Sequence, residues 1–130
     1  MRLILNFALA FVFINCSEKK ETDTHGNSVE TTNETSVNQT PKALGKELFK
    51  GKGMCATCHK PDVKTVGPSI KDIAKIYKEK GANIADFINE NGEPLVDPSQ
   101  YEIMKANFAI TKAMSAEERK AIEIYMMSFE

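Results

Sequence analysis

The stretch KGKGMCATCHKP, residues 50–61, places Cys55 and Cys58 three positions apart, with His59 immediately after them. Three kinds of site are built from such residues: a redox-active disulfide, a structural zinc ion and a covalently attached haem. Each requires a different fold and a different set of partner residues elsewhere in the chain. The rest of the sequence therefore decides which site this is and which fold surrounds it.

The disulfide and zinc interpretations find little support in the rest of the chain. A redox-active Cys-x-x-Cys pair of the thioredoxin type lies in a βαβ unit, but no segment shows the sustained period-two alternation of a half-buried strand. A zinc site needs four ligands, usually two cysteine pairs or a cysteine pair with a histidine pair. From residue 41 onward the chain has only two cysteines and one histidine, and His59 adjoins Cys58 in a way that crowds a tetrahedron.

Covalent haem attachment has Cys-x-x-Cys-His as its signature. Cysteines at positions i and i+3 lie on one face of a helical turn, so the thiols of Cys55 and Cys58 can reach the two vinyl groups at one edge of the porphyrin. The imidazole of His59, the next residue, then points at the iron. The stretch therefore predicts one covalent haem c, with His59 as its proximal axial ligand.

The first 16 residues are typical of an export signal. Arg2 precedes an almost unbroken apolar run over residues 3–14, which is shorter than the roughly 20 residues of a membrane-spanning helix and fits a signal peptide. The run ends at Cys16 in a pattern that resembles a bacterial lipoprotein signal, although Phe13 and Asn15 stand where leucine and a small residue are usual. We expect export to the periplasmic side and lipidation of Cys16 as a membrane anchor. An ordinary signal peptide or an uncleaved anchor is the alternative.

Residues 17–40 have the composition of a disordered tether. Nine of these 24 residues are Ser or Thr, and the only aliphatic side chains are Val29 and Val37. Such a segment cannot bury enough apolar surface to offset the chain entropy lost on folding. We therefore expect the folded domain at residues 41–130, and we interpret His25 as a solvated linker residue.

The domain is predicted to be all-α, with four or five short helices. Its helix start and stop signals recur in order: Pro41 with Gly51, Ser69 with Gly81, Asn83 with Gly92, Asp97 with Pro98, and the capping box of Ser115 and Glu118. About 90 residues give a thin core, and domains of this size often need a cofactor or a staple. The formal net charge of −1 argues against nucleic-acid binding driven by bulk charge.

These features resemble the class I cytochromes c, small monohaem electron carriers, over the whole predicted domain. In that family a helix with a glycine and an aromatic residue precedes the haem motif and crosses the C-terminal helix. Gly45 and Phe49 occupy those positions, and Tyr125 is the matching aromatic partner. A Gly-Pro pair commonly follows the motif, and here it is Gly67-Pro68. The resemblance implies a small class I cytochrome c fold around one haem, in which the Pro68 carbonyl accepts a hydrogen bond from the proximal histidine and fixes its orientation.

The resemblance also implies a methionine as the second axial ligand. Met104 lies before the last predicted helix, 45 residues beyond His59, in a segment that resembles the family's ligand loop, although the usual Met-Pro pair is missing. Met114 is the alternative, but it directly precedes the capping serine, where packing against the last helix also explains it. Three methionines are not expected to ligate, because they lie beside the motif or within the last helix: Met54, Met126 and Met127.

A haem with both axial positions filled favours electron transfer over catalysis. The expected function is therefore one-electron transfer, without enzymatic activity, between periplasmic or membrane redox partners such as a quinol-oxidising complex and a terminal oxidase or reductase. The alternative is a five-coordinate haem domain that acts as a peroxidase or a gas-ligand sensor, which requires that Met104 not ligate.

Charge is distributed unevenly along the domain. Residues 42–80 carry ten lysines against four acids, a net charge of +6, and residues 81–130 carry four basic against nine acidic residues, a net charge of −5. Because the first block contains the motif, its lysines either steer an acidic partner toward the haem edge or simply keep exposed helix faces in water.

Overall fold

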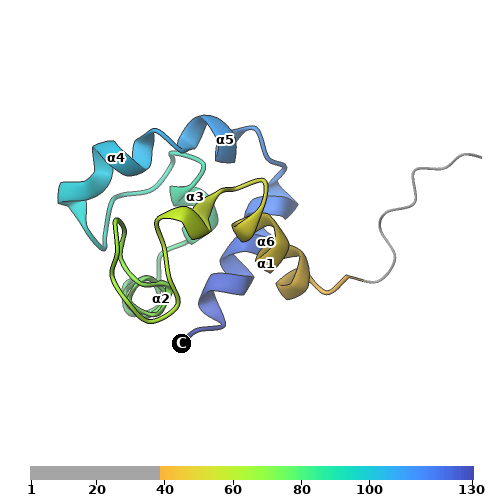
Figure 1. Ribbon diagram of the computed structural model, residues 1–130, viewed down its shortest axis with the longest axis horizontal. Helices are drawn as coiled ribbons and strands as arrows, with labels where there is room; N and C mark the ends of the chain where they lie inside the picture. The colour runs from red at the N-terminus through yellow and green to blue at the C-terminus, as the bar shows by residue number, and fades with distance from the viewer. Residues whose placement is uncertain (1–38) are drawn as a thin grey trace, which may run out of the picture. The chain divides into compact units, whose positions relative to one another are not determined.

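The structure is a computed structural model that describes residues 39–130. The predicted signal peptide, with Cys16, and nearly all of the predicted tether lie outside these described residues. Within residues 39–130 every regular element is helical, as the sequence predicted: α1 (Pro41–Lys50), η1 (Cys55–Thr57), α2 (Ile70–Lys80), α3 (Ile84–Phe87), η2 (Pro98–Gln100), α4 (Tyr101–Lys105), α5 (Phe108–Lys112) and α6 (Ala116–Met127) (Figure 1). No helix in this part of the chain is both long and apolar enough to cross a membrane.

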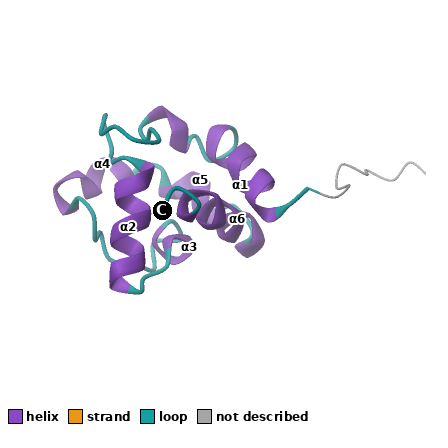
Figure 2. Ribbon diagram, turned by 90° about the horizontal axis from the view of Figure 1, so that it is seen from below, coloured by secondary structure: helices purple, strands orange, loops and turns teal. Residues whose placement is uncertain are grey.

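The first and last helices, α1 and α6, lie against each other (Figure 2) and make the most extensive contact between elements of residues 39–130. They approach most closely at Gly45. A Cβ atom on Gly45 would lie 1.9 Å from the carbonyl oxygen of Ala121 and 2.9 Å from the Cβ atom of Tyr125, so only glycine fits here. Beside the crossing, the rings of Phe49 and Tyr125 meet edge to face with centroids 5.3 Å apart. The expected packing of the first helix on the last is confirmed.

Several helix ends lie where the sequence predicted them. α2 begins after Ser69, whose hydroxyl accepts a hydrogen bond from the Asp72 backbone N–H at 3.0 Å, and it ends at Gly81, which has a left-handed φ of 60°. α6 begins with the complete capping box of Ser115 and Glu118. One face of α2 is buried against the core: Ile70, Ile73, Ala74 and Tyr77.

Two other helix predictions were wrong in detail. α3 is shorter than expected: it ends at Phe87, not near Gly92, and the chain turns at Glu90, which has a left-handed φ of 63°. Asp97 stands at the N-cap position of η2, with Pro98 next as predicted, but its side chain makes no capping hydrogen bond. The Asp97 carboxylate instead accepts hydrogen bonds from the Ser99 hydroxyl at 2.5 Å and the Lys64 ammonium at 2.8 Å, so it has another use than the helix end.

The chain from residue 94 to residue 107, called the distal segment, contacts the rest of the domain through partly buried side chains, among them Leu95, Val96 and Met104. η2 and α4, which lie within it, contribute no buried residue, and α4 has its main contacts with its chain neighbours η2 and α5. Figure 1 shows α4 and α5 along one edge of the domain. The Tyr101 ring connects α4 to the core through Phe87 and Phe108, at centroid distances of 6.4 and 6.0 Å.

Candidate haem-binding site

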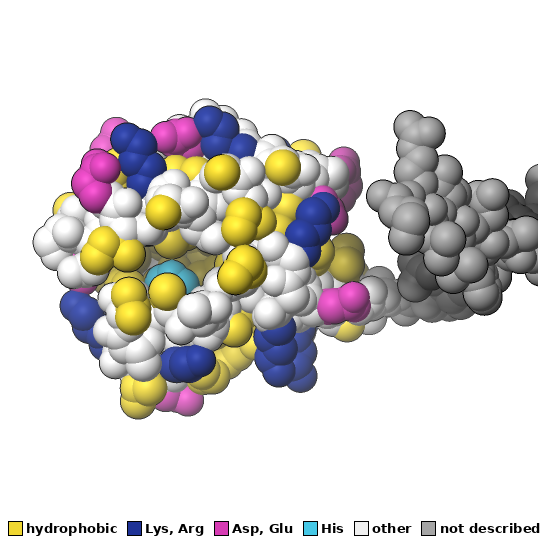
Figure 3. Space-filling model, turned by 45° about the horizontal axis from the view of Figure 1, so that its top comes forward, with side chains coloured by type: hydrophobic (Ala, Val, Ile, Leu, Met, Phe, Trp, Pro, Cys, Tyr) yellow, Lys and Arg dark blue, Asp and Glu magenta, His cyan; other side chains and the backbone are white. Residues whose placement is uncertain are grey.

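A cavity of about 340 Å³ lies between the Cys-x-x-Cys-His motif and the distal segment. Figure 3 shows its mouth as a hollow ringed by apolar side chains, with a histidine at the floor. This residue is His59, because residues 39–130 contain no other histidine. Helices far apart in the sequence supply apolar side chains to the wall, among them Phe49, Ile73, Ile84, Ile103 and Met126. Volume and lining are those of a cofactor site, for which about 300–1,000 Å³ is usual.

Cys55 begins η1 and Cys58 directly follows it, and both line the cavity. The carbonyl oxygen of Cys55 accepts hydrogen bonds from the backbone N–H groups of Cys58 at 3.2 Å and His59 at 3.0 Å, which closes the turn. Both thiols are free, and burial raises the pKa of Cys55 to about 11. Met54, just before the turn, has a left-handed φ of 53°. The turn thus presents both sulfur atoms and the next side chain to one cavity.

The ring of His59 is held by the Gly-Pro pair that follows the motif. Its Nδ1 lies 2.8 Å from the carbonyl oxygen of Pro68. A carbonyl can only accept, so Nδ1 carries the proton and Nε2 keeps its lone pair free for a metal. Burial lowers the pKa of His59, and the Pro68 carbonyl partly opposes this, so the neutral ring that a metal needs is favoured.

Gly67 lets the chain pass directly over the His59 ring. A Cβ atom at Gly67 would lie 2.4 Å from Cε1 of the imidazole, too close for any other residue. The same loop is fixed to the motif at the carbonyl oxygen of Cys58, which accepts hydrogen bonds from the Gly67 N–H at 3.0 Å and the Thr65 hydroxyl at 2.6 Å. The imidazole therefore has little freedom to turn.

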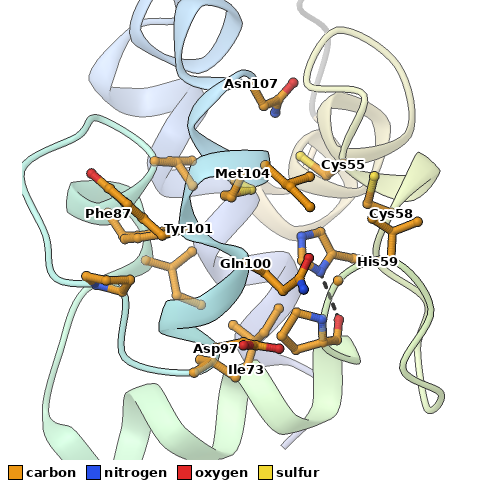
Figure 4. Close-up of a pocket in the computed structure, with 18 of the residues that line it drawn as sticks. Cys55, Cys58, His59, Ile73, Phe87, Asp97, Gln100, Tyr101, Met104 and Asn107 are labelled. Atoms are coloured by element: carbon orange, nitrogen blue, oxygen red, sulfur yellow. Dashed lines mark hydrogen bonds between the residues drawn. The ribbon is translucent and has the colours of Figure 1, made fainter.

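The methionines of the domain divide into those that line the cavity and those that do not. Met104, on α4, lines it, and Figure 4 shows its side chain facing the side that carries Cys55, Cys58 and His59. Met114 is 4% exposed but lies in the core outside the cavity wall. Met54 lines the cavity at its exposed rim, and Met126 lines it from α6. Met127 does not line the cavity.

Two polar contacts join the distal segment to the motif side of the cavity, and sequence reasoning missed both. The side-chain amide of Asn107 donates to the Gly53 carbonyl at 3.0 Å. The Lys64 ammonium pairs with Asp97 at 2.8 Å. Nothing in the local sequence signals either contact, because each joins residues more than thirty positions apart.

The residues around the cavity fit a covalently attached haem. Two thiols, an imidazole with a free Nε2 and a methionine thioether all line one apolar cavity. These are the groups that anchor and ligate haem in c-type sites. The close approach at Gly67 and the fixed ring of His59 show a site built around that imidazole.

Comparisons with known proteins agree with this donor set. The family model described as cytochrome c matches residues 42–130. Cytochrome c-551 of Pseudomonas denitrificans is 44% identical over 47 residues, 36% of this chain and 56% of that protein. Cytochrome c-551 of Azotobacter vinelandii is 50% identical over 44 residues, 34% of this chain and 51% of that protein. The chain thus spans about half the length of these curated relatives. With its helical fold and its Cys-x-x-Cys-His motif, the chain belongs to the cytochrome c family, in the class I monohaem form, and its cofactor is covalently bound haem c.

Proposed function

We propose that this protein is a one-electron carrier in which His59 and Met104 are the two axial ligands of the haem. The observation that carries the proposal is that Met104 lines the same cavity as His59, Cys55 and Cys58, while Met114 does not. When bound, the haem supplies an iron that gains and loses one electron. The two cytochrome c-551 relatives belong to the same family and support a carrier role by similarity.

The chain's own residues would set how readily the iron changes its charge. Cys55 and Cys58 would hold the porphyrin through thioether bonds. His59 would ligate through Nε2, made more basic by the Nδ1–H···O=C bond to Pro68. The Met104 thioether would favour the ferrous state and so raise the reduction potential. The apolar wall keeps water away, which limits solvent reorganisation when the electron moves.

We further propose that the carrier works on the periplasmic side of a bacterial membrane, with Cys16 lipidated as its anchor. The export-like first 16 residues support this location. Redox partners such as a membrane quinol-oxidising complex and a terminal oxidase or reductase would dock transiently, as electron-transfer complexes do. Mass spectrometry of the membrane fraction tests the anchor: a diacylglycerol-modified Cys16 supports it, and an unmodified Cys16 overturns it.

Substitution of single methionines in the holoprotein tests the ligand assignment. Loss of the red-region methionine-to-iron absorption band in Met104→Ala, with the band kept in Met114→Leu and Met126→Leu, is the expected result. Met104→His should instead give a spectrum with two nitrogen ligands, which shows that the variant still folds around its haem. Survival of the band in Met104→Ala would show that another residue ligates.

A carbon monoxide challenge separates the carrier from a five-coordinate haem domain that acts as a peroxidase or a gas sensor. The ferrous holoprotein should not bind CO, because Met104 would occupy the distal position. Rapid CO binding by the resting ferrous protein would contradict the carrier proposal.

A further inference from the structure

The distal segment is held over the cavity by partly buried side chains, of which Leu95, Val96 and Met104 pack against the core. It supplies Leu95, Tyr101 and Met104 to the cavity wall, yet η2 and α4 within it have no buried residue. The main helical core, α1, α2, α3 and α6, makes no extensive contact with α4 among the described elements. Polar side-chain contacts near its two ends, Asn107 with Gly53 and Asp97 with Lys64, add to this apolar packing.

The ion pair of Lys64 and Asp97 is the contact at its N-terminal end. The Lys64 ammonium lies 2.8 Å from the Asp97 carboxylate, and the two side chains are 63% and 17% exposed. Ser99 donates to the other carboxylate oxygen at 2.5 Å, which orients the carboxylate. Both contacts lower the pKa of Asp97, with Lys64 contributing most, so the carboxylate is charged at neutral pH.

Lys64 belongs to the loop that orients the proximal histidine. Its neighbour Thr65 donates to the Cys58 carbonyl at 2.6 Å, and Gly67 in the same loop packs on the His59 ring. Asp97 lines the cavity and lies near the N-terminal end of the distal segment, which also carries Met104 (Figure 4). The ion pair therefore joins the loop that holds His59 directly to the distal segment.

We propose that the Lys64–Asp97 ion pair is a positioning pair that keeps the distal segment closed over the haem cavity and so controls how often the distal ligand leaves the iron. The inference rests on the proposed function, in which Met104 is that ligand. An external ligand binds only when the segment is open, so its apparent affinity follows the open fraction. Weakening the ion pair raises that fraction.

Imidazole titration of the oxidised holoprotein measures the open fraction, through replacement of the methionine-to-iron band. Lys64→Gln and Asp97→Asn should each raise the imidazole affinity about two- to fivefold, the range expected for an ion pair that is largely exposed on one side. The double variant should match the single variants, because one interaction is lost in all three.

Lys112→Gln is the matched control. Lys112 pairs with Glu90 at 2.6 Å, with side chains 50% and 32% exposed, and neither residue lines the cavity. This variant should bind imidazole as the unmodified protein does. An equal rise in the control, unchanged affinity in the Lys64 and Asp97 variants, or a double variant that sums the single effects would overturn the proposal.

Amide hydrogen exchange separates failure of this inference from failure of the ligand assignment. The N–H groups of Gln100 and Asn107 bond to Asp97 and Met104 carbonyls within the distal segment. They should exchange faster in Lys64→Gln than in the unmodified holoprotein, whichever residue ligates the iron. If the unmodified protein lacks the methionine-to-iron band, the ligand assignment fails, and the exchange rates alone then test whether the ion pair holds the segment. Unchanged exchange rates in Lys64→Gln would overturn the role of the ion pair.

Discussion

The side-chain amide of Asn107 donates a 3.0 Å hydrogen bond to the carbonyl oxygen of Gly53, which lies 54 residues earlier in the chain. The bond ties the end of the distal segment to the chain just before the haem motif. Gly53 is buried, and the thiol of Cys55 also points at its carbonyl, at 3.4 Å. A thioether has no S–H to donate. In the haem-bearing protein, Asn107 is therefore the side-chain donor that this carbonyl keeps.

Asn107→Ala should destabilise the holoprotein by about 1–3 kcal/mol, the cost of a buried carbonyl left without its donor. Denaturant unfolding followed by helical circular dichroism measures the change. Asn107→Asp is the matched variant of nearly the same shape, and it should also destabilise because an ionised carboxylate cannot donate. Unfolding at the same denaturant concentration as the unmodified protein would show that water replaces the amide at no cost.

Gly45→Ala should destabilise the domain although alanine favours helices more than glycine does. In an exposed helix the same change stabilises by about 0.5–1 kcal/mol. Here the new methyl group would lie 1.9 Å from the Ala121 carbonyl oxygen, so α1 and α6 must move apart. The expected loss is about 1–3 kcal/mol, the usual cost of overpacking. A raised melting temperature of the holoprotein would contradict the close crossing.

Residues whose partners are near in sequence could be predicted from sequence alone. The caps at Ser69 and Ser115 and the left-handed Gly81 depend on backbone groups within a few residues. The motif brings Cys55 and Cys58 to one cavity because a single turn joins them, closed by the hydrogen bond from the Cys58 N–H to the Cys55 carbonyl. Gly45 needed more: its partner in α6 was known only through the resemblance to the cytochromes c.

Contacts between distant segments could not be predicted, because they depend on how the helices pack. Asp97 looked like a helix cap, but the loop that carries Lys64 lies close enough in space to bind it. The uneven charge along the chain is also partly cancelled in space. Three lysines of the basic residues 42–80 form ion pairs with carboxylates of the acidic residues 81–130: Lys52 with Glu118, Lys64 with Asp97, and Lys78 with Glu130. Three of the ten lysines in residues 42–80 are therefore already paired within the domain.

The chain without its haem should lose most of its helical structure. The cavity opens to solvent at its mouth, so without haem its apolar wall would face water, and a domain of about 90 residues has little other core to hold it together. The total stability of a small domain is only about 5–15 kcal/mol, so exposure of this wall would be a large loss. Cys55→Ala/Cys58→Ala, which cannot attach haem, should show weak far-UV circular dichroism beside the holoprotein. Retention of the full helical signal in this variant would mean that the cavity collapses cheaply.

Acid should remove a stabilising contact between the motif side of the domain and α6. Glu118 accepts two hydrogen bonds from the Lys52 ammonium, at 2.7 and 2.8 Å, and one from the Ser115 N–H at 2.8 Å. These contacts, that with Lys52 foremost, lower the pKa of Glu118 from its ordinary 4.5. A lowered pKa in the folded state stabilises the protein above pH 4.5, and this contribution disappears as the pH falls through the folded-state pKa.

Glu118→Gln should therefore be less stable than the unmodified holoprotein at pH 7 and equally stable once Glu118 is protonated. Urea unfolding of both proteins across the acid range checks this. Lys52→Gln should show a smaller acid dependence than the unmodified protein, and a Glu118→Gln deficit that persists at full protonation would mean that the carboxylate charge is not its source.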